Sequence, residues 1–146
     1  GWLKCNTDGA FYDRQWKGAT GAVLRDDNGA FVRASAKWYD NCLDALTSEA
    51  LACRDGLQMA RHINATKFGW RLILRRCCGF GKLARINDLN GVFQSFKFTH
   101  IAQSCNEVAH VIAKQVTGDT RSGWWSCALA CVSNLLIRDC NVDSNE

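Results

Sequence analysis

The sequence predicts a mixed α/β domain that opens with an antiparallel sheet and then packs a long helix against it. Residues 3–11, 17–25 and 30–37 have the lengths and the alternating side chains of three strands. Residues 44–64 follow, with small side chains at three- and four-residue spacing. Because a helix with such a face packs closely on a sheet, this order of elements predicts the fold class.

The connections between these elements carry their own signals. Residues 26–29, Asp-Asp-Asn-Gly, predict a hairpin, and the Asn-Gly pair predicts a type I′ turn with two residues at positive φ. Asp44 or Thr47 is the expected N-cap of the helix. The small residues of the helix face the sheet, whereas the polar side that contains Asp55 is expected to face solvent.

Length and composition predict one intracellular unit. The 146 residues suffice for a single core, here residues 1–140, followed by a polar tail at 141–146. No stretch is long and apolar enough to span a membrane, and no secretory signal opens the chain. The nine scattered cysteines are expected to be reduced, and the net charge of +4 mildly favours an anionic partner. The Gly-Trp start predicts a piece of something longer, so we expect a monomer or a part of a polyprotein.

The second half of the chain predicts one further strand and a segment that returns to the sheet. Residues 93–100 alternate as a strand. Asn106 is the expected cap of a helix whose apolar face begins at Val108. The apolar segment at 124–137 is expected to fold back on the sheet.

A single carboxylate, Asp8, stands in the middle of the first strand. An ionised aspartate costs several kcal/mol to bury unless it is paired or bound to a metal. Two interpretations need no function: the strand ends at Thr7, or Asp8 is a turn residue before Gly9. The functional interpretation is a metal-ligand aspartate on a central strand, with Gly9 leaving room for a ligand or a neighbouring backbone.

Glu49 stands on the small-residue face of the predicted helix instead of its polar face. A glutamate near a helix start can simply stabilise the helix dipole. It can also point toward Asp8, which would bring two carboxylates together at the sheet. The residues alone leave both interpretations open.

Three motifs in this order resemble the ribonuclease H type-1 domain. They are Asn-Thr-Asp-Gly-Ala at 6–10, Thr-Ser-Glu-Ala at 47–50 and Asn-Glu-Val-Ala-His-Val-Ile-Ala-Lys at 106–114. The chain is most similar to the plant version found alone or at the end of retrotransposon reverse transcriptases, over residues 3–67 and 93–140. The resemblance implies a five-stranded mixed sheet flanked by helices. It also implies Mg²⁺-dependent, endonucleolytic hydrolysis of the RNA strand of an RNA–DNA hybrid.

The resemblance assigns roles to residues of this chain. Asp8 and Glu49 would hold Mg²⁺, or Mn²⁺ in its place, through hard carboxylate oxygens. His110 occupies a position that is aspartate in many cellular enzymes and would be a third catalytic residue, although a lone helix histidine can also be structural. Gly9 and Ser48, beside the two acids, would contact the nucleic acid.

A further carboxylate of the family, an aspartate in a motif like Glu-Thr-Asp-Ser at the end of the fourth strand, is missing. Residues 68–85 contain five basic residues and no acidic one, against a net charge of +4 for the whole chain. One interpretation is a basic patch for nucleic acid, in which Arg71 and Arg75 bind phosphates. On this interpretation and on the one that follows, the segment 68–86 is anomalous for the family.

The second interpretation of this segment is a shifted reading frame. Suitable codons for a family-like Lys-Val-Trp-Leu-Glu-Thr-Asp-Ser-Gln-Glu, with one G deleted after Lys67, encode residues 67–75 as they stand. The codon of the missing aspartate then lies beneath Leu72 and Ile73, and the frame is restored near Asn87. An intact frame in the transcript, with no insertion or deletion relative to a close paralogue, would remove this hypothesis.

Three functions remain open from the sequence. The first is a hybrid-specific nuclease impaired by the loss of the third carboxylate. The second is a catalytically inactive domain that binds an RNA–DNA hybrid or another nucleic acid through lysine and arginine. The third is a non-catalytic interaction domain or a retroelement remnant without a selected role.

Overall fold

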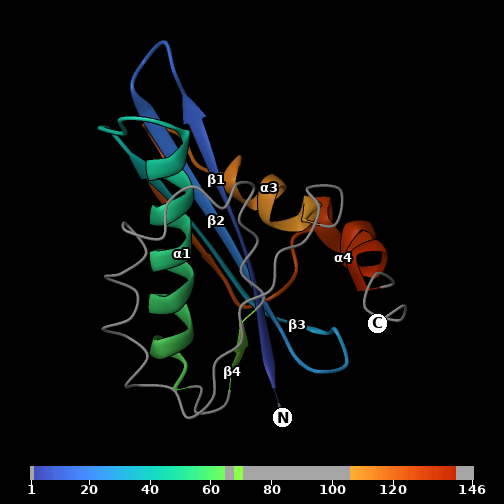
Figure 1. The fold of residues 1–146 in the computed structure, drawn as a ribbon. Coiled ribbons are helices and arrows are strands. Elements are labelled where there is room, and N and C mark those ends of the chain that lie inside the picture. The colour runs from blue at the N-terminus through green and yellow to red at the C-terminus, as the bar shows by residue number, and fades with distance from the viewer. Residues whose placement is uncertain (1, 65–67, 71–105, 141–146) are drawn as a thin grey trace.

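The computed structural model describes residues 2–64, 68–70 and 106–140 (Figure 1). The strands are β1 (Leu3–Tyr12), β2 (Lys17–Arg25), β3 (Phe31–Tyr39), β4 (Phe68–Trp70) and β5 (Ser122–Trp125). The helices are α1 (Ala45–His62), α3 (Glu107–Ala113) and α4 (Ser133–Cys140), with a 3₁₀ turn, η3 (Ala130–Val132), before α4. The three predicted strands and the helix after them are therefore present in the predicted order.

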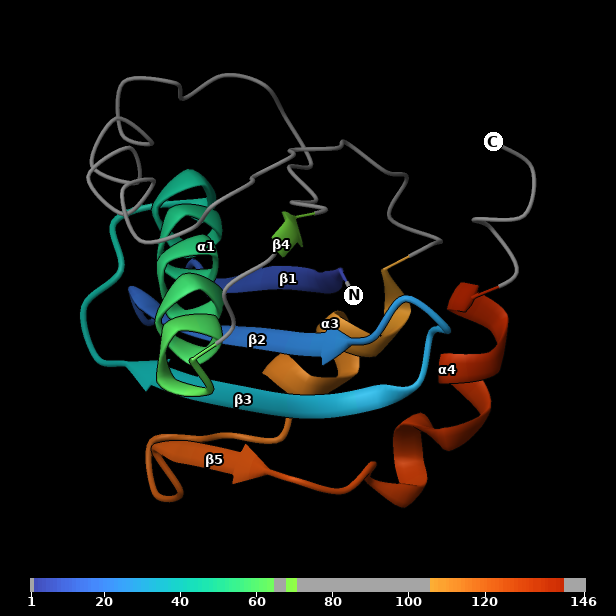
Figure 2. The ribbon, with the colours of Figure 1, turned by 90° about the horizontal axis from the view of Figure 1, so that it is seen from below.

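The strands form one mixed sheet in the order β4-β1-β2-β3-β5 (Figure 2). Strands β1, β2 and β3 are an antiparallel meander, as predicted. Strand β4 runs parallel to β1, and β5 runs antiparallel to β3. Within the described residues, the long meander thus occupies the centre of the sheet and the two short strands flank it.

Helix α1 covers one face of the sheet, and α3 lies on the other with α4 beside it (Figure 1). Helix α1 begins after Asp44, whose carboxylate accepts hydrogen bonds from the N–H and the hydroxyl of Thr47, both at 2.6 Å. This cap satisfies a backbone donor that the first helical turn leaves without a partner. Small residues of α1 such as Ala60 then pack with Cys5 and Leu24 of the sheet in one core.

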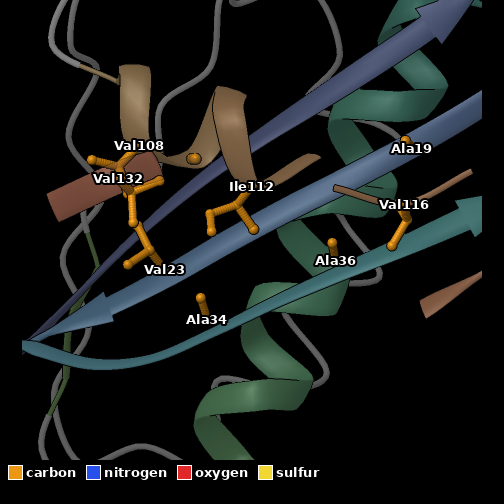
Figure 3. Close-up of a cluster of buried hydrophobic side chains, with 9 residues drawn as sticks. Ala19, Val23, Ala34, Ala36, Val108, Ile112, Val116 and Val132 are labelled. Atoms are coloured by element: carbon orange, nitrogen blue, oxygen red, sulfur yellow. The ribbon is translucent and has the colours of Figure 1, made fainter. Parts of the chain in front are cut away.

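A second core lies between the sheet and α3 (Figure 3). Alanine and valine side chains of β2 and β3 cluster there with Val108 and Ile112 of α3, and η3 contributes one more valine. The helix comes this close because Gly21 of β2 has no side chain. A Cβ on Gly21 would overlap the Ala109 carbonyl oxygen and lie 2.5 Å from the backbone nitrogen of Ala113. This glycine therefore sets the distance between α3 and the sheet.

The turn between β2 and β3 is not the predicted type I′ turn. Gly29 has a φ of 80°, but Asn28 does not lie at positive φ. The Asp26 carboxylate accepts the N–H groups of Asn28 at 3.0 Å and of Ala30 at 2.8 Å. The predicted hairpin is confirmed, but the predicted turn type is wrong. The Asp26 carboxylate, an acceptor at the start of the turn, takes the place of the second residue at positive φ.

Asp55 of α1 is buried, although its position in the helix predicts a solvent-facing side chain. It is 8% exposed, and its carboxylate accepts the Thr20 hydroxyl at 2.6 Å and the Tyr39 hydroxyl at 2.7 Å. The prediction was wrong because these hydroxyls come from β2 and β3. A pattern within the helix carries no information about them.

The remaining predictions concern the later strands and the segment that returns to the sheet. The predicted strand at 93–100 lies outside the described residues, and so does the anomalous segment 68–86 except for β4. The segment at 124–137 returns to the sheet as expected, since Trp124 and Trp125 belong to β5. Among the residues that the structure describes, no helix is long and apolar enough to cross a membrane.

Candidate active site

Asp8 lies inside β1 and not at its end. The strand continues to Tyr12, and Asp8 is paired with Gly21 of β2. The strand therefore does not end at Thr7, and Asp8 is not a turn residue before Gly9. The side chain of Asp8 is only 5% exposed, so its carboxylate depends on partners within the protein.

Glu49 of α1 reaches the backbone beside Asp8. Its Oε2 accepts the N–H of Gly9 at 3.3 Å, and the residue is 8% exposed. Gly9 permits this approach, because a Cβ there would overlap the Ser48 carbonyl group and lie 2.6 Å from the backbone nitrogen of Glu49. Glu49 also lies beyond the first turn of α1, where the helix dipole has little effect. The structure thus favours the interpretation in which Glu49 points toward β1, at the residue next to Asp8.

The two carboxylates approach β1 from different sides. Backbone N–H groups point along the plane of a sheet, so the N–H of Gly9 that meets Glu49 is directed to the edge of β1 away from β2. Thr7 and Gly9 both contact α1, and strand alternation therefore turns Asp8 to the opposite face. The described part of β4 is paired with β1 along Leu3–Cys5. Asp8 and the Gly9 N–H that meets Glu49 lie beyond these three residues along β1.

His110 of α3 joins the group from the face opposite to α1. Its Nδ1 lies 2.8 Å from Asp8 Oδ2, and its side chain is 34% exposed. A protonated imidazole forms an ion pair with the carboxylate, and a neutral imidazole can donate the same hydrogen bond through Nδ1. The structure therefore brings the three predicted catalytic residues together: Asp8 contacts His110, and Glu49 contacts the next backbone N–H.

Two buried asparagines hold α3 at this strand. The Nδ2 of Asn106 donates to the carbonyl oxygen of Thr7 at 2.8 Å, and Asn6 Nδ2 donates to Asn106 Oδ1 at 3.4 Å. Asn106 stands at the N-cap of α3 as predicted, but its side chain makes no capping hydrogen bond. This contact was not predicted. The sequence offered one signal for this contact, because one asparagine stands shortly before Asp8 and another shortly before His110.

We expect Asn106→Ala to lower the free energy of unfolding by about 2 kcal/mol, because the buried carbonyl of Thr7 and the amide of Asn6 each lose a partner. Urea unfolding followed by circular dichroism measures this change. The matched control is Asn28→Ala, an exposed asparagine of the β2–β3 turn, which should change the free energy by less than about 0.5 kcal/mol. Equal effects of the two substitutions would show that the asparagine pair does not hold α3.

Cys53, one helical turn after Glu49, is not a nucleophile of this site. Burial raises the pKa of its thiol to about 12; the Thr7 hydroxyl, 3.9 Å away, opposes this rise, and the charge of Glu49 adds to it. The thiol therefore stays protonated at neutral pH. A neutral group here adds no further negative charge beside the two acids.

The donor atoms of the site suit a hard divalent cation in kind but not in number. Asp8 and Glu49 offer carboxylate oxygens, which Mg²⁺ and Mn²⁺ prefer. Within the described parts of the chain, however, no three side chains among histidine, cysteine, aspartate and glutamate are grouped so that they could hold a metal ion. Among the described residues, a cation would depend on the two carboxylates, one of which also engages His110.

The remaining predicted contacts with nucleic acid fall into two sets. Gly9 and Ser48 are buried between β1 and α1, and the Ser48 hydroxyl donates to the carbonyl oxygen of Ala45 at 2.7 Å. They shape the contact of helix and strand that places Glu49. Arg71 and Arg75 lie outside the described residues.

The fold is shared with ribonucleases H. The ribonuclease H1 of the halophilic archaeon Halobacterium salinarum has a TM-score of 0.70 at 20% identity, over 79% of this chain and 96% of that one. LC11-RNase H1, solved in complex with an RNA/DNA hybrid, has a TM-score of 0.65 at 15% identity, over 78% and 95%. The N-terminal RNase H domain of rv2228c from Mycobacterium tuberculosis has the same TM-score and identity, over 77% and 91%. The chain therefore has a ribonuclease H-like fold.

The family comparison is more specific for the first half of the chain. Residues 6–68 match the family model described as reverse transcriptase-like. This stretch contains Asp8 and Glu49 and ends where β4 begins. A comparison with curated proteins gave no match. The predicted resemblance is confirmed, and the predicted plant origin stays a prediction.

Proposed function

We propose that this domain binds RNA–DNA hybrids beside Asp8 and hydrolyses the RNA strand with Mg²⁺ or Mn²⁺. We expect a rate at least about 100-fold below that of a site with the full set of carboxylates. The observation that carries the proposal is the convergence of β1, α1 and α3 at one point. His110 lies 2.8 Å from Asp8, and Glu49 lies 3.3 Å from the adjacent Gly9 N–H.

Support for the substrate class comes from the fold and the charge. LC11-RNase H1, which has a similar fold, was solved with an RNA/DNA hybrid. The net charge of +4 also favours a polyanionic partner. The match of residues 6–68 to the reverse transcriptase-like family fits an origin in a retroelement. We include that origin in the proposal.

The chemistry of the site follows from its donors. A bound divalent cation supplies an activated water and charge neutralisation at the scissile phosphate. Asp8 and Glu49 would hold it through their carboxylate oxygens. His110 orients the Asp8 carboxylate through Nδ1 and can exchange a proton through Nε2. With two carboxylates instead of three, the site has less negative charge to attract a cation, which is the physical reason for the low expected rate.

We expect the purified domain to cleave an end-labelled RNA strand slowly in a hybrid, and we expect Asp8→Asn to abolish this cleavage. The amide keeps the shape of the side chain but loses its charge and one acceptor oxygen. Denaturing gels over a series of Mg²⁺ and Mn²⁺ concentrations measure the rate. The matched control is Asp13→Asn in the exposed turn after β1, which should cleave as the unchanged protein does.

Cleavage by the Asp8→Asn protein at the unchanged rate would assign the activity to a contaminant and overturn the proposal. Absence of cleavage by every variant, together with binding of the hybrid, would support the alternative function.

That alternative is a catalytically inactive nucleic-acid-binding domain. It is favoured by one observation, the lack of a three-ligand metal group within the residues that the structure covers. Hybrid binding that is unchanged by a chelator and falls steeply with salt would establish it. A domain that binds no hybrid at all would be an interaction domain or a retroelement remnant.

A further inference from the structure

A pocket with both polar and apolar walls lies between α1 and the β3–β5 side of the sheet. Its volume is about 470 Å³, and its walls include Lys37, Gln58, His62 and Trp124. This side is opposite to the β4 side (Figure 2). The pocket is on the α1 side, whereas Asp8 is turned to the α3 side. It is therefore separate from the candidate active site.

Trp124 presents an exposed ring at this pocket. The residue is 46% exposed, although its neighbour Trp125 packs against the core on the other face of β5. The indole and the His62 ring form an edge-to-face pair at a centroid distance of 5.4 Å, and the guanidinium of Arg33 lies over the indole, 5.6 Å from its centroid. Contacts on two sides hold the ring in place. An exposed aromatic ring that is already positioned is a surface on which a base can stack at little entropic cost.

Two basic side chains of β3 lie at this pocket: Lys37 in its wall and Arg33 over the Trp124 ring. Arg33 and Lys37 stand two alternations apart on β3 and therefore point to the same face of the sheet. The acid in the wall, Asp55, is compensated: it accepts the hydroxyls of Thr20 and Tyr39, and the guanidinium of Arg54 lies 3.5 Å away. The rim is therefore suited to a ligand that carries negative charge.

The hydroxyl of Tyr39 keeps this compensation in place over the physiological pH range. Burial and the charge of Asp55 raise the pKa of Tyr39 well above its ordinary value. The hydroxyl therefore stays protonated and donates to Asp55, while Arg54 donates to the Tyr39 oxygen at 2.7 Å. The Asp55 carboxylate is thus bound by residues of β2, β3 and α1, and it is not directed at a ligand.

We propose that the α1-side face of β3 and β5 binds single-stranded nucleic acid, with one base stacked on Trp124 and phosphates on Arg33 and Lys37. The polar groups of Gln58 and Ser35, which also line the pocket, can meet the edge of that base. A pocket with an aromatic wall accepts an unstacked base, whereas the bases of a duplex or a hybrid are stacked on each other. The proposal goes beyond the hybrid site and does not depend on cleavage.

The test is binding of a fluorescein-labelled oligothymidylate to the full chain, measured by anisotropy. We expect Trp124→Ala to weaken binding about 10-fold, because base stacking on an aromatic ring is lost, and Trp124→Phe to retain most of the affinity. Lys37→Glu should also weaken binding and reduce the salt dependence by about one phosphate contact. The matched control, Lys114→Glu, changes an exposed lysine at the end of α3 and should have little effect.

Thermal unfolding of each variant shows whether it is folded, and Trp124→Phe provides a second variant of the same ring. Oligothymidylate binding that is equal for the Trp124→Ala, Lys37→Glu and unchanged proteins would overturn the proposal. Equal loss of binding for Lys37→Glu and Lys114→Glu would also overturn it, because the effect would then be one of net charge. Hybrid cleavage is measured in parallel. Asp8→Asn should abolish cleavage and leave oligothymidylate binding intact, so failure of one proposal is distinguishable from failure of the other.

Discussion

Replacing Ile73 with aspartate is expected to raise the rate of hybrid cleavage at least about 100-fold, because it adds a third carboxylate to the two of the proposed nuclease site. Strands β4 and β1 pair residue for residue, with Phe68–Trp70 opposite Leu3–Cys5. The proposed single-nucleotide deletion would hide an aspartate codon beneath Leu72 and Ile73. Position 73 is where the family-like sequence has that aspartate.

The matched control for this gain is Ile73→Asn, which has the same size as the aspartate but no charge. Cleavage rates of the two variants are compared on the same end-labelled hybrid, and the Ile73→Asp rate should depend on Mg²⁺ and disappear when Asp8→Asn is added. A second variant, in which residues 68–76 are replaced by the family-like Val-Trp-Leu-Glu-Thr-Asp-Ser-Gln-Glu, guards against a local distortion. If both restored variants cleave no faster than Ile73→Asn, the missing carboxylate is not the cause of a low rate.

Gly21→Ala is expected to lower the free energy of unfolding by about 3 kcal/mol and the melting temperature by about 10 °C. The added methyl group would overlap the Ala109 carbonyl oxygen and lie 2.5 Å from the backbone nitrogen of Ala113. These are backbone atoms of α3, so no side-chain rotation relieves the contact. The helix must move away from the sheet, and His110 moves with it.

Urea unfolding and differential scanning calorimetry measure this effect, and hybrid cleavage reports on His110. The matched control is Gly118→Ala, at which a Cβ would meet the Trp38 ring at ordinary distances of 3.6 and 3.9 Å. We expect a change of less than about 1 kcal/mol there. If Gly21→Ala lowers the free energy of unfolding as little as Gly118→Ala does, α3 can shift freely, against the close packing argued here.

Most elements whose signals are local agree with their predictions, with the type of the turn at residues 26–29 as the exception. The strand pattern of the meander, the hairpin at residues 26–29 and the Asp44 cap each depend on neighbouring residues, and the structure contains all three. The small-residue face of α1 was also readable, because helical periodicity shows which residues share a face. Glu49 stood out on that face, and it does reach the backbone next to Asp8.

Features that join distant parts of the chain were predicted poorly or not at all. Asp55 was assigned to solvent because its partners Thr20 and Tyr39 come from other strands. The Asn6–Asn106 contact spans 100 positions and leaves no periodic trace. The pairing of β5 with β3, which creates the Trp124 pocket, likewise depends on where the chain returns to the sheet.

The amino-acid pattern by itself therefore determined the order of the early strands and α1, the choice of Asp8, Glu49 and His110 as candidates, and the lack of an acid in residues 68–85. Only the tertiary structure decided that His110 binds Asp8 and that Asn106 anchors α3 to β1. The reason is physical: periodicity and capping act over a few residues, whereas side-chain hydrogen bonds between elements depend on how the chain is packed.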